Sequence, residues 1–309
     1  MAENYGLPYT GSKSRIAHWV VDNLPRGRVL IDAFAGGCAI THRALLSQKW
    51  QTIIANDING KYPQLFFDAI HGRYRDERRW ISREDFERLK SQDAFVACCW
   101  SFGNNLRCYM YSRDIEPYKR ALHYAIVLND FEPMQELMPE VAQAVHEAIH
   151  WIRNTHDRRI TAQNVIVKTL KRLTGDNYAH QIIQSNPLYR SILHSNKDAQ
   201  RLERLERLER LRITSLSYNK IDIQDDAVVY CDPPYHASDN SLYEGTAKAF
   251  DHCAFYDWCV RVSKTNPIFI SEYSIEDDRF EIVAEKSKIT SMSYVKSFNV
   301  TERLYTVKK

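Results

Sequence analysis

Four consecutive residues, Asp232-Pro233-Pro234-Tyr235, carry the clearest chemical signal in the 309-residue chain. They follow an apolar run, 227–231, of the kind that forms a buried strand. The Asp232 carboxylate and the Pro233 carbonyl could accept both hydrogens of an exocyclic aromatic amine, which would draw the nitrogen lone pair out of the ring plane toward a sulfonium methyl group. Tyr235 would stack on a base that has left its duplex. The pattern favours methylation of an amine on a base; a surface turn with two prolines is the alternative.

Two earlier segments have the pattern of strands that end in ligand-binding turns. A short apolar run ends in Asp32 and leads through a turn with Gly36 and Gly37 into a helical stretch. The next strand, 52–55, is followed by Asp57, which lies 25 residues after Asp32. A glycine turn lets the backbone approach a ligand, and an acid about 20 residues further on can hold a ribose diol. The GxGxxG dinucleotide fingerprint and a Walker lysine loop are both absent from the sequence, so a sulfonium nucleoside fits this pattern better than a dinucleotide.

The α/β pattern is interrupted and then resumes. Further runs of strand length lie at 212–214, 227–231 and 267–271. The intervening segment is rich in Arg, Trp and Tyr and helical in its spacing, which is shown by Val141, Val145, Ala148, Ile149 and Ile152 and by a second stretch at 161–173 that Gly175 would end. We therefore expect one α/β sheet that is split in the sequence by a helical insert.

A triplet repeat, RLERLERLERLR, occupies residues 201–212. Its leucines step by three, so on an α-helix they wind around the axis and form no single stripe. Pairs such as Glu203 with Arg207 would support a helix at i,i+4 spacing. We expect a short charged helix that connects the insert to the sheet. A coiled coil is the less favoured alternative, because the 3.5-residue spacing is absent.

The net charge of +3 is unevenly distributed along the chain. Residues 71–212 hold 24 Lys and Arg against 19 Asp and Glu, whereas the rest of the chain holds 18 against 20. A basic middle segment is typical of an insert that binds a polyanion, although a helical region with a solvated basic face has the same charge. The charge distribution alone does not distinguish a polyanion-binding insert from a solvated basic face.

Composition excludes several protein classes. The hydrophobic fraction of 44% and the charged fraction of 26% are those of a globular chain, and no apolar run reaches the roughly 18 residues that span a bilayer. The seven cysteines form no CxxC pair, which argues against a disulfide framework and a zinc ribbon. The N-terminus has no signal-peptide pattern. We expect a protein of the reducing cytosol.

In their order and content these segments resemble the Dam-like DNA adenine-N6 methyltransferases, in which a glycine motif, a target-recognition insert and DPPY follow one another. The resemblance covers nearly the whole chain outside the insert. Matching segments lie at 8–13, 32–37, 56–59, 217–218, 250–252 and 269–273. DPPY is the specific element, and the others gain weight through their order. One departure from the family pattern is that Cys38-Ala39 stands where the FxGxG loop has its final glycine.

The resemblance implies a Rossmann-like α/β fold that binds S-adenosyl-L-methionine. The catalytic residues would be Asp232, Pro233, Pro234 and Tyr235. The cofactor-binding residues would be Tyr9, Gly11, Lys13, Asp32, Phe34, Gly36, Gly37, Asp57, Ser217 and Asp232. The catalytic domain would comprise residues 1–70 and 212–309, and a mostly helical DNA-recognition insert would comprise residues 71–211.

The function that follows from the resemblance is methyl transfer to N6 of adenine in a specific site of double-stranded DNA, with the base flipped out of the duplex. We expect a monomer in the cytoplasm of a bacterium or a phage-infected cell, with no metal ion and no membrane association. A cognate restriction endonuclease is a candidate partner. Cytosine-C5 chemistry is disfavoured because the sequence contains no Pro-Cys pair.

Residues 100–113 mix aromatic, amide and arginine side chains with a Gly-Asn turn. Amides pair with adenine and guanidiniums with guanine in the major groove, and aromatics can fill the space that a flipped base leaves. An aromatic-x-Asn hairpin contacts the target site in the resembling family. The expected DNA-binding residues are Asn104, Asn105, Arg107 and Arg113, with Tyr118, Lys119 and Arg120 on phosphates. A second basic and aromatic cluster comprises Arg73, Arg75, Arg78, Arg79 and Trp80.

Two other functions stay open on the sequence alone. His146, Glu147 and His150 form an HExxH pattern, and His156 has the spacing of a third zinc ligand, as in zinc proteases. Arg153 occupies the position where that pattern requires glycine, which disfavours a zinc hydrolase. The other alternative is a DNA-binding protein of the same fold without catalytic activity, against which the intact DPPY argues.

Overall fold

The computed structural model describes residues 5–9, 11–74, 77–153, 155–173, 208–235, 250–293 and 296–309. The chain forms two compact units, one of residues Met1–Arg73 with Asn196–Lys309 and the other of residues Tyr74–Ser195. The sequence places the boundaries at 70 and 212. The assignment of catalysis to the first unit and DNA recognition to the second stays a prediction.

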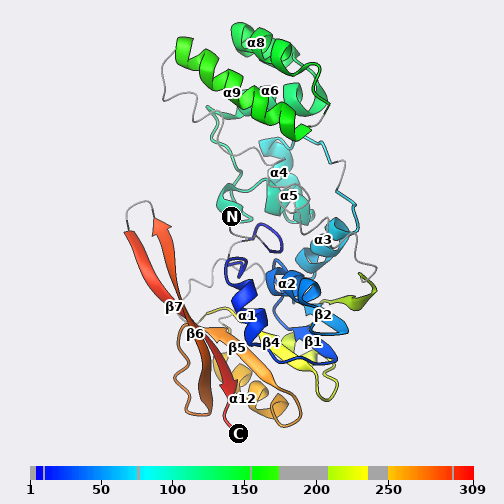
Figure 1. Cartoon of the computed structure of the whole chain (residues 1–309), viewed down its shortest axis with the longest axis vertical. Coiled ribbons are helices and arrows are strands. Elements are labelled where there is room, and N and C mark those ends of the chain that lie inside the picture. Colours follow the sequence, from blue (N-terminus) through cyan, green and yellow to red (C-terminus); the bar gives the residue numbers. More distant parts are fainter. Residues whose placement is uncertain are drawn as a thin grey trace. The chain divides into compact units, whose positions relative to one another are not determined.

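The first unit is built on a seven-stranded sheet (Figure 1) with the order β3-β2-β1-β4-β5-β7-β6. The first five strands in this order are parallel, whereas β7 is antiparallel to β5 and β6. The strands are β1 (Val29–Asp32), β2 (Thr52–Asn56), β3 (Leu211–Thr214), β4 (Val228–Cys231), β5 (Ile268–Glu272), β6 (Phe280–Ser293) and β7 (Lys296–Val307). The expected Rossmann-like α/β class is confirmed.

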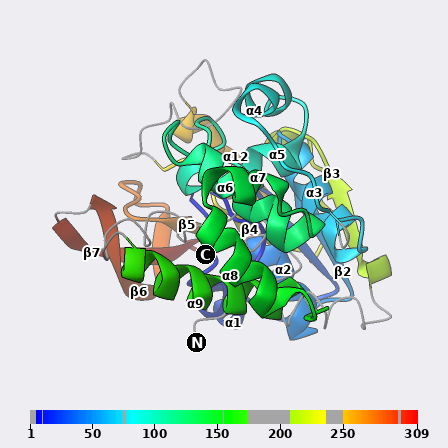
Figure 2. The same ribbon diagram turned by 90° about the horizontal axis from the view of Figure 1, so that it is seen from above.

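The central strands are buried on both faces, as their nearly continuous apolar sequences require. On one face Ile31, Val229 and Ile270 pack with Phe255 and Trp258 of helix α12 (His252–Val262). The opposite face is covered by α1 (Ala17–Asn23) and α2 (Ala39–Ser47), as Figures 1 and 2 show together. Helix α3 (Lys61–Ile70) follows β2. The sheet is therefore the middle layer of three.

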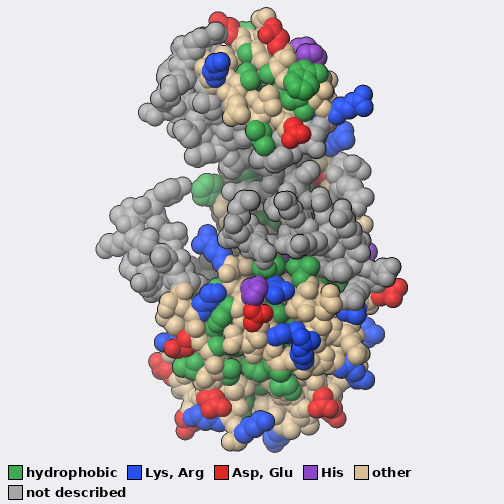
Figure 3. Space-filling view, viewed as in Figure 1, with side chains coloured by type: hydrophobic (Ala, Val, Ile, Leu, Met, Phe, Trp, Pro, Cys, Tyr) green, Lys and Arg blue, Asp and Glu red, His purple; other side chains and the backbone are tan. Residues whose placement is uncertain are grey.

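Charged side chains of both signs are scattered over this unit on the face seen in Figure 3. Lys and Arg side chains are interspersed there with Asp and Glu among the described residues. None of the helices in the described ranges is long and apolar enough to cross a membrane.

The described part of the second unit is helical. Its elements are α4 (Arg83–Leu89), α5 (Ala94–Cys99), a 3₁₀ turn (Phe102–Asn104), α6 (Glu116–His123), a π-helical turn (Tyr124–Leu128), α7 (Glu132–Leu137), α8 (Pro139–Ile149) and α9 (Thr155–Leu173). Its main core comprises Ala121, Leu122, Ala125, Ile126, Met134, Met138, Val141, Ala142, Val145, Ile149, Ala162 and Ile166. The buried Arg158 of α9 donates to the carbonyls of Ala125, Ile126 and Ile152, and so satisfies acceptors at helix ends.

Two expectations about helices need correction. Helix α9 begins at Thr155, six residues before the expected start at 161. In the triplet repeat, Leu208–Arg210 forms a 3₁₀ turn and Leu211 opens β3, where it pairs with Ile53 of β2. Pairing with a buried strand outweighs the helical preference of these last residues. Gly175 and residues 201–207 lie outside the described residues.

Candidate functional site

The strand register brings the candidate residues to one edge of the sheet. Asp32 pairs with Ala55 of β2 and with Tyr230 of β4. Asp57 and Asp232 each lie two residues beyond those partners, so both follow the carboxyl ends of strands that flank β1. The strand order reverses between β1 and β4, and open α/β sheets bind ligands in the crevice outside such a reversal.

Asp57 is fixed against the glycine turn. Its Oδ2 accepts a hydrogen bond from Gly36 N at 2.9 Å, and its Oδ1 accepts one from Asn59 N at 2.8 Å. Burial raises the pKa of this carboxyl, and the two hydrogen bonds oppose the rise. Each carboxylate oxygen has a further lone pair. The side chain is thus held in one orientation as an acceptor for hydroxyl groups, which fits a ribose diol.

The turn itself requires its two glycines. Gly36 has φ +46°, in the left-handed region, and a Cβ at Gly37 would lie 2.7 Å from the Cβ of Tyr9. The Tyr9 ring also contacts Tyr62 with centroids 5.0 Å apart. Tyr9 therefore packs on the glycine turn, and its contact with the cofactor stays a prediction. Gly11 lies on an exposed bend of positive φ that follows.

Asp32 lies below this surface and is 1% exposed. Thr41 donates to its Oδ2 twice, from the main-chain N at 3.2 Å and from Oγ1 at 2.7 Å. Its Oδ1 is buried and has no hydrogen-bond partner among the described residues. Burial raises the pKa of Asp32 to about 7, and the nearby Asp232 adds to the rise. Through Oδ2, Asp32 connects β1 to the first turn of α2, while its Oδ1 is an acceptor with no partner among the described residues.

An aromatic cluster lies beside the glycine turn. The half-buried Phe34 stacks on Tyr218, with centroids 5.6 Å apart and an interplanar angle of 28°. Phe250 and Phe255 each meet Phe34 edge to face. Ser217 precedes Tyr218 in the loop after β3 and is half-buried. Such rings offer flat apolar surfaces to a purine.

Asp232 is paired with Lys13. The Lys13 ammonium donates to Asp232 Oδ1 at 2.7 Å, and the two side chains are 8% and 18% exposed. The same ammonium lies 4.4 Å from the centroid of the Tyr235 ring. Pro233 is buried and Pro234 is half-buried. Asp232, the expected catalytic residue, is therefore held in an ion pair, and Lys13 lies beside the DPPY motif.

Tyr235 is buried and anchored at its hydroxyl. It donates to Glu302 Oε1 of β7, and its ring meets the Tyr273 ring edge to face at 4.6 Å. Burial raises the pKa of Tyr235, so the phenol keeps its proton and acts as a donor. The ring is 8% exposed, so stacking on a flipped base would need the Lys13 ammonium or another neighbour to leave the ring. The stacking role stays a prediction.

Glu302 is the site residue that the sequence interpretation missed. It is fully buried, and its Oε1 also lies 3.8 Å from the Lys13 ammonium. The available signal was an acid at an inward position of an alternating strand, beside the buried Leu304. Its partners lie 67 and 289 residues away in the sequence, so local reading could not supply them.

The 100–110 hairpin of the second unit carries the expected base-reading residues. Ser101 and Tyr109 form an antiparallel bridge, and Met110 N donates to Trp100 O. Phe102 at the loop is 63% exposed. Asn104 has φ +60° and is half-buried.

The two remaining expected residues of this hairpin serve its own fold in part. Asn105 Oδ1 accepts hydrogen bonds from the main-chain N of Arg107 and of Cys108, both at 2.9 Å, so this oxygen holds the loop. Arg107 is half-buried, and its carbonyl accepts from Lys90.

The residues that we expect to contact phosphates differ in their exposure to solvent. Arg113 and Arg120 are exposed, and Tyr118 is half-buried. Lys119 is 2% exposed and lies 5.6 Å from the centroid of the Tyr111 ring, and its burial lowers its pKa to about 8. This is a correction: a side chain enclosed in this way is not a surface phosphate contact, because helix α6 turns it toward the aromatic residues of the unit.

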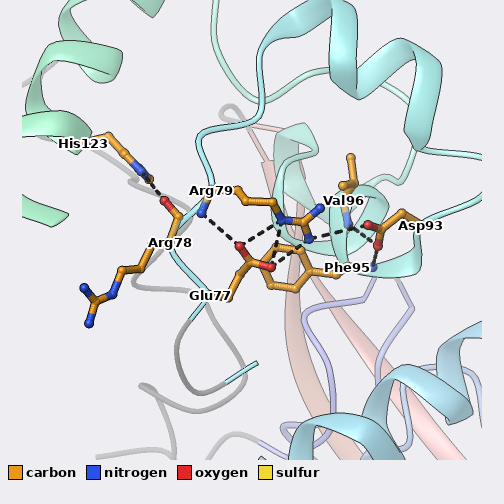
Figure 4. A network of polar contacts seen from close by, with 7 residues as sticks. All are labelled: Glu77, Arg78, Arg79, Asp93, Phe95, Val96 and His123. Carbon is orange, nitrogen blue, oxygen red and sulfur yellow. Dashed lines mark hydrogen bonds and ion pairs between the residues drawn. The ribbon is translucent and has the colours of Figure 1, made fainter. Parts of the chain in front are cut away.

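The second basic cluster is partly committed to internal contacts (Figure 4). The Arg79 guanidinium forms hydrogen bonds with Glu77, and its NH2 lies 3.6 Å from Asp93. His123 is buried, burial lowers its pKa to about 4, and its neutral ring therefore donates from Nε2 to the Arg78 carbonyl. Arg78 is exposed and its side chain points away from the Glu77 carboxylate in Figure 4. Arg73, Arg78 and Arg79 are all exposed, although Arg73 is paired with Asp68 and Arg79 with Glu77. Arg75 lies outside the described residues.

The HExxH residues lie on and just after an ordinary surface helix. His146 and His150 stack with centroids 5.5 Å apart, and His150 Nδ1 faces the carbonyls of His146 and Glu147. Within the described residues, no group of three His, Cys, Asp or Glu is arranged to hold a metal ion. The His156 side chain lies outside the described residues.

Comparison with known families gives one match. Residues 9–133 match the family described as D12 class N6 adenine-specific DNA methyltransferase. The matched span contains the glycine turn, Asp57 and the 100–110 hairpin, and it ends before DPPY. A search among curated proteins found no match. Together with the sheet order, the family match indicates that this chain is an adenine-specific DNA methyltransferase.

Proposed function

We propose that the chain transfers a methyl group from S-adenosyl-L-methionine to N6 of adenine in one specific site of double-stranded DNA, and that the adenine is flipped out of the duplex to reach Asp232. One observation carries the proposal most directly. The acid of the DPPY motif follows the strand next to β1, at the reversal point of the sheet, and is held there by a buried ammonium.

The residues at this edge fit the cofactor chemically. Asp57 is an oriented acceptor for a ribose diol, and the buried Asp32 Oδ1 is an acceptor without a partner in the described chain. Phe34 and Tyr218 supply an aromatic surface for the adenine ring. When bound, S-adenosyl-L-methionine supplies an electrophilic methyl group whose bonding electrons stay on sulfur as the new carbon–nitrogen bond forms.

Asp232 and the Pro233 carbonyl would bind the amine of the flipped adenine. Each would accept one N6 hydrogen, which turns the nitrogen lone pair out of the ring plane and makes it a nucleophile. One N6 proton is lost after transfer and passes through the Asp232 carboxylate to water. The enzyme needs no covalent intermediate for this reaction, because binding and orientation supply the acceleration.

The 100–110 hairpin would open the duplex. Phe102 is an exposed aromatic at the start of its loop, and a ring of this size can fill the gap that a flipped base leaves. The amide of Asn104 would read base edges, while Arg113, Arg120 and Arg78 would bind phosphates. In unmethylated DNA with 2-aminopurine in place of the target adenine, Phe102→Ala should reduce the fluorescence rise on binding, since fewer bases leave the stack.

We also propose that the enzyme acts as a monomer, because Lys13, Asp232, Tyr235 and Glu302 come from one chain. Its substrate places it with the DNA of a bacterium or of a phage-infected cell. A restriction endonuclease that cuts the same site unmodified would be its cognate partner.

The central test is transfer of labelled methyl groups to unmethylated genomic DNA, followed by long-read mapping of the modified bases. N6-methyladenine at one short motif is the expected result. Asp232→Ala should abolish transfer while DNA affinity stays within about twofold of wild type, since Asp232 makes no duplex contact in this scheme. Asp225→Ala, an exposed acid before β4, is the matched control. Methylation that persists in Asp232→Ala would refute the catalytic assignment.

A further inference from the structure

Glu302 is a buried acid in a position that packing alone would fill with an apolar residue. It lies in β7 beside the buried Leu304 and Tyr305 and has no exposed surface. Burial of a carboxylate costs several kcal/mol unless partners compensate it. Two residues of the candidate site lie against its Oε1, the Lys13 ammonium and the Tyr235 hydroxyl. These site residues therefore help to compensate the cost of burial.

The position of Glu302 follows from the sheet. In the antiparallel pairing of β5 and β7, Glu272 lies opposite Arg303, and on the other side of β7 Glu302 pairs with Lys286 of β6. Tyr273 directly follows β5. Tyr273 in turn packs edge to face on Tyr235. The acid is therefore fixed by backbone pairing, and the Lys13 and Tyr235 side chains converge on it.

The Lys13 ammonium lies between two carboxylates. It is 2.7 Å from Asp232 Oδ1 and 3.8 Å from Glu302 Oε1. The amine of the substrate competes with the Lys13 ammonium for the Asp232 carboxylate. If Asp232 were its single counter-ion, this competition would displace the ammonium. The second carboxylate gives the ammonium a counter-ion that would remain beside it when Asp232 engages the amine.

We propose that Glu302 is a positioning residue for methyl transfer, which holds Lys13 beside Asp232 and fixes the Tyr235 ring through its hydroxyl. The inference rests on the proposed function, since it assigns Asp232 to the adenine amine. Glu302 touches neither adenine nor cofactor in this scheme, and it acts through Lys13 and Tyr235.

The test is a comparison of single-turnover methylation rates for wild type, Glu302→Gln and Glu285→Gln. Glutamine keeps an acceptor for the Tyr235 hydroxyl and removes the charge. The Glu302 variant should lose about tenfold or more in rate, with the dissociation constants for DNA and cofactor within about twofold of wild type. Glu285 lies on β6 in an exposed pair with Arg303, so its variant removes one charge from the same hairpin and should keep the wild-type rate.

A double-mutant cycle with Lys13→Gln separates positioning through Lys13 from a general loss of structure. If Glu302 acts mainly through Lys13, Glu302→Gln should lower the rate by less than about twofold in the Lys13→Gln background. Lys13→Gln leaves Glu302 buried without this ammonium, so the double variant should melt at a higher temperature than Lys13→Gln alone. This second comparison decides the matter even where Glu302→Gln alone does not fold.

A wild-type rate in a folded Glu302→Gln, or a double variant no more stable than Lys13→Gln, would overturn the proposal. A multiplicative loss of rate across the cycle would equally do so. Failure of the proposed function is a separate result: wild type and Glu285→Gln would then place no methyl group on adenine, whereas the melting comparison would still report whether Glu302 and Lys13 act as a pair.

Discussion

Asp32→Asn should remove a fall in stability that the sheet-containing unit shows between pH 3.8 and about 7. The pKa of Asp32 rises from 3.8 to about 7 because the carboxyl is fully buried. Between those values the folded chain binds a proton that the unfolded chain has released, so this group makes stability fall as pH rises through the window and adds no further change above it. From pH 5 to pH 8 the loss is about 3 kcal/mol, at 1.36 kcal/mol for each pH unit below the folded pKa.

Asparagine removes that dependence while it keeps most of the local structure. Its carbonyl oxygen can accept both hydrogen bonds from Thr41, and its amide then occupies the position of Oδ1, which has no partner in the described chain. A buried amide without acceptors costs about 1–3 kcal/mol. Relative to wild type, the variant should therefore gain about 3 kcal/mol of stability between pH 5 and pH 8, whatever the fixed cost of its amide.

The measurement is urea unfolding at pH 5, 6, 7 and 8, read by a brief deuterium pulse at one common pH and the mass of the peptide that contains β1. This readout follows the sheet-containing unit alone. Asp225→Asn, an exposed position with the same loss of charge, is the control and should keep the wild-type pH dependence. An Asp32→Asn profile parallel to wild type would refute the assignment of the pH dependence to Asp32.

If Asp32 also contacts the cofactor, the same variant should bind S-adenosyl-L-methionine more weakly. A gain in stability with unchanged affinity would show that Asp32 is not a cofactor-binding residue.

Three other perturbations test separate parts of the molecule. Asp57→Ala should raise the cofactor dissociation constant about tenfold or more in calorimetry, because it removes both the diol acceptor and the anchor of Gly36; an unchanged constant would contradict the ribose assignment. Arg113→Gln with Arg120→Gln should reduce the slope of log affinity against log salt by about 2, and a slope equal to wild type would exclude phosphate contacts at both positions. Tyr109→Phe should lower the free energy of unfolding of the helical unit by about 1 kcal/mol, since the hydroxyl donates to the buried Ile81 carbonyl at 2.7 Å; no change in urea midpoint would show that water replaces the bond.

Local sequence patterns predicted those features that depend on strand ends. Asp57 and Asp232 could be placed because each follows an apolar run, and parallel strands bring their carboxyl ends to one edge. Lys119 was misassigned to the surface, since its burial depends on how α6 packs against Tyr111. Glu302 was missed for the same physical reason, because its role depends on the pairing of β5 with β7. The roles of such side chains depend on contacts between segments that are distant in the sequence, so a local sequence pattern cannot predict them.

The same reasoning explains how a long insert can divide this sheet in the sequence. The chain leaves the sheet-containing unit after α3 and returns to it at β3, which pairs only with β2 at the edge of the sheet in the described chain. The central pairs of β1 with β4 and of β4 with β5 form without any residue of the insert. Lys13, Asp232 and Glu302 come from segments on either side of it, so the insert can vary in length and content while the ion pair at the reacting corner is unchanged. If the insert reads DNA as proposed, selection for new DNA sites would act on it without changing the strands that carry Asp32 and Asp232. The chain leaves after α3, which follows β2, and returns at the edge strand β3, so neither connection uses β1 or β4.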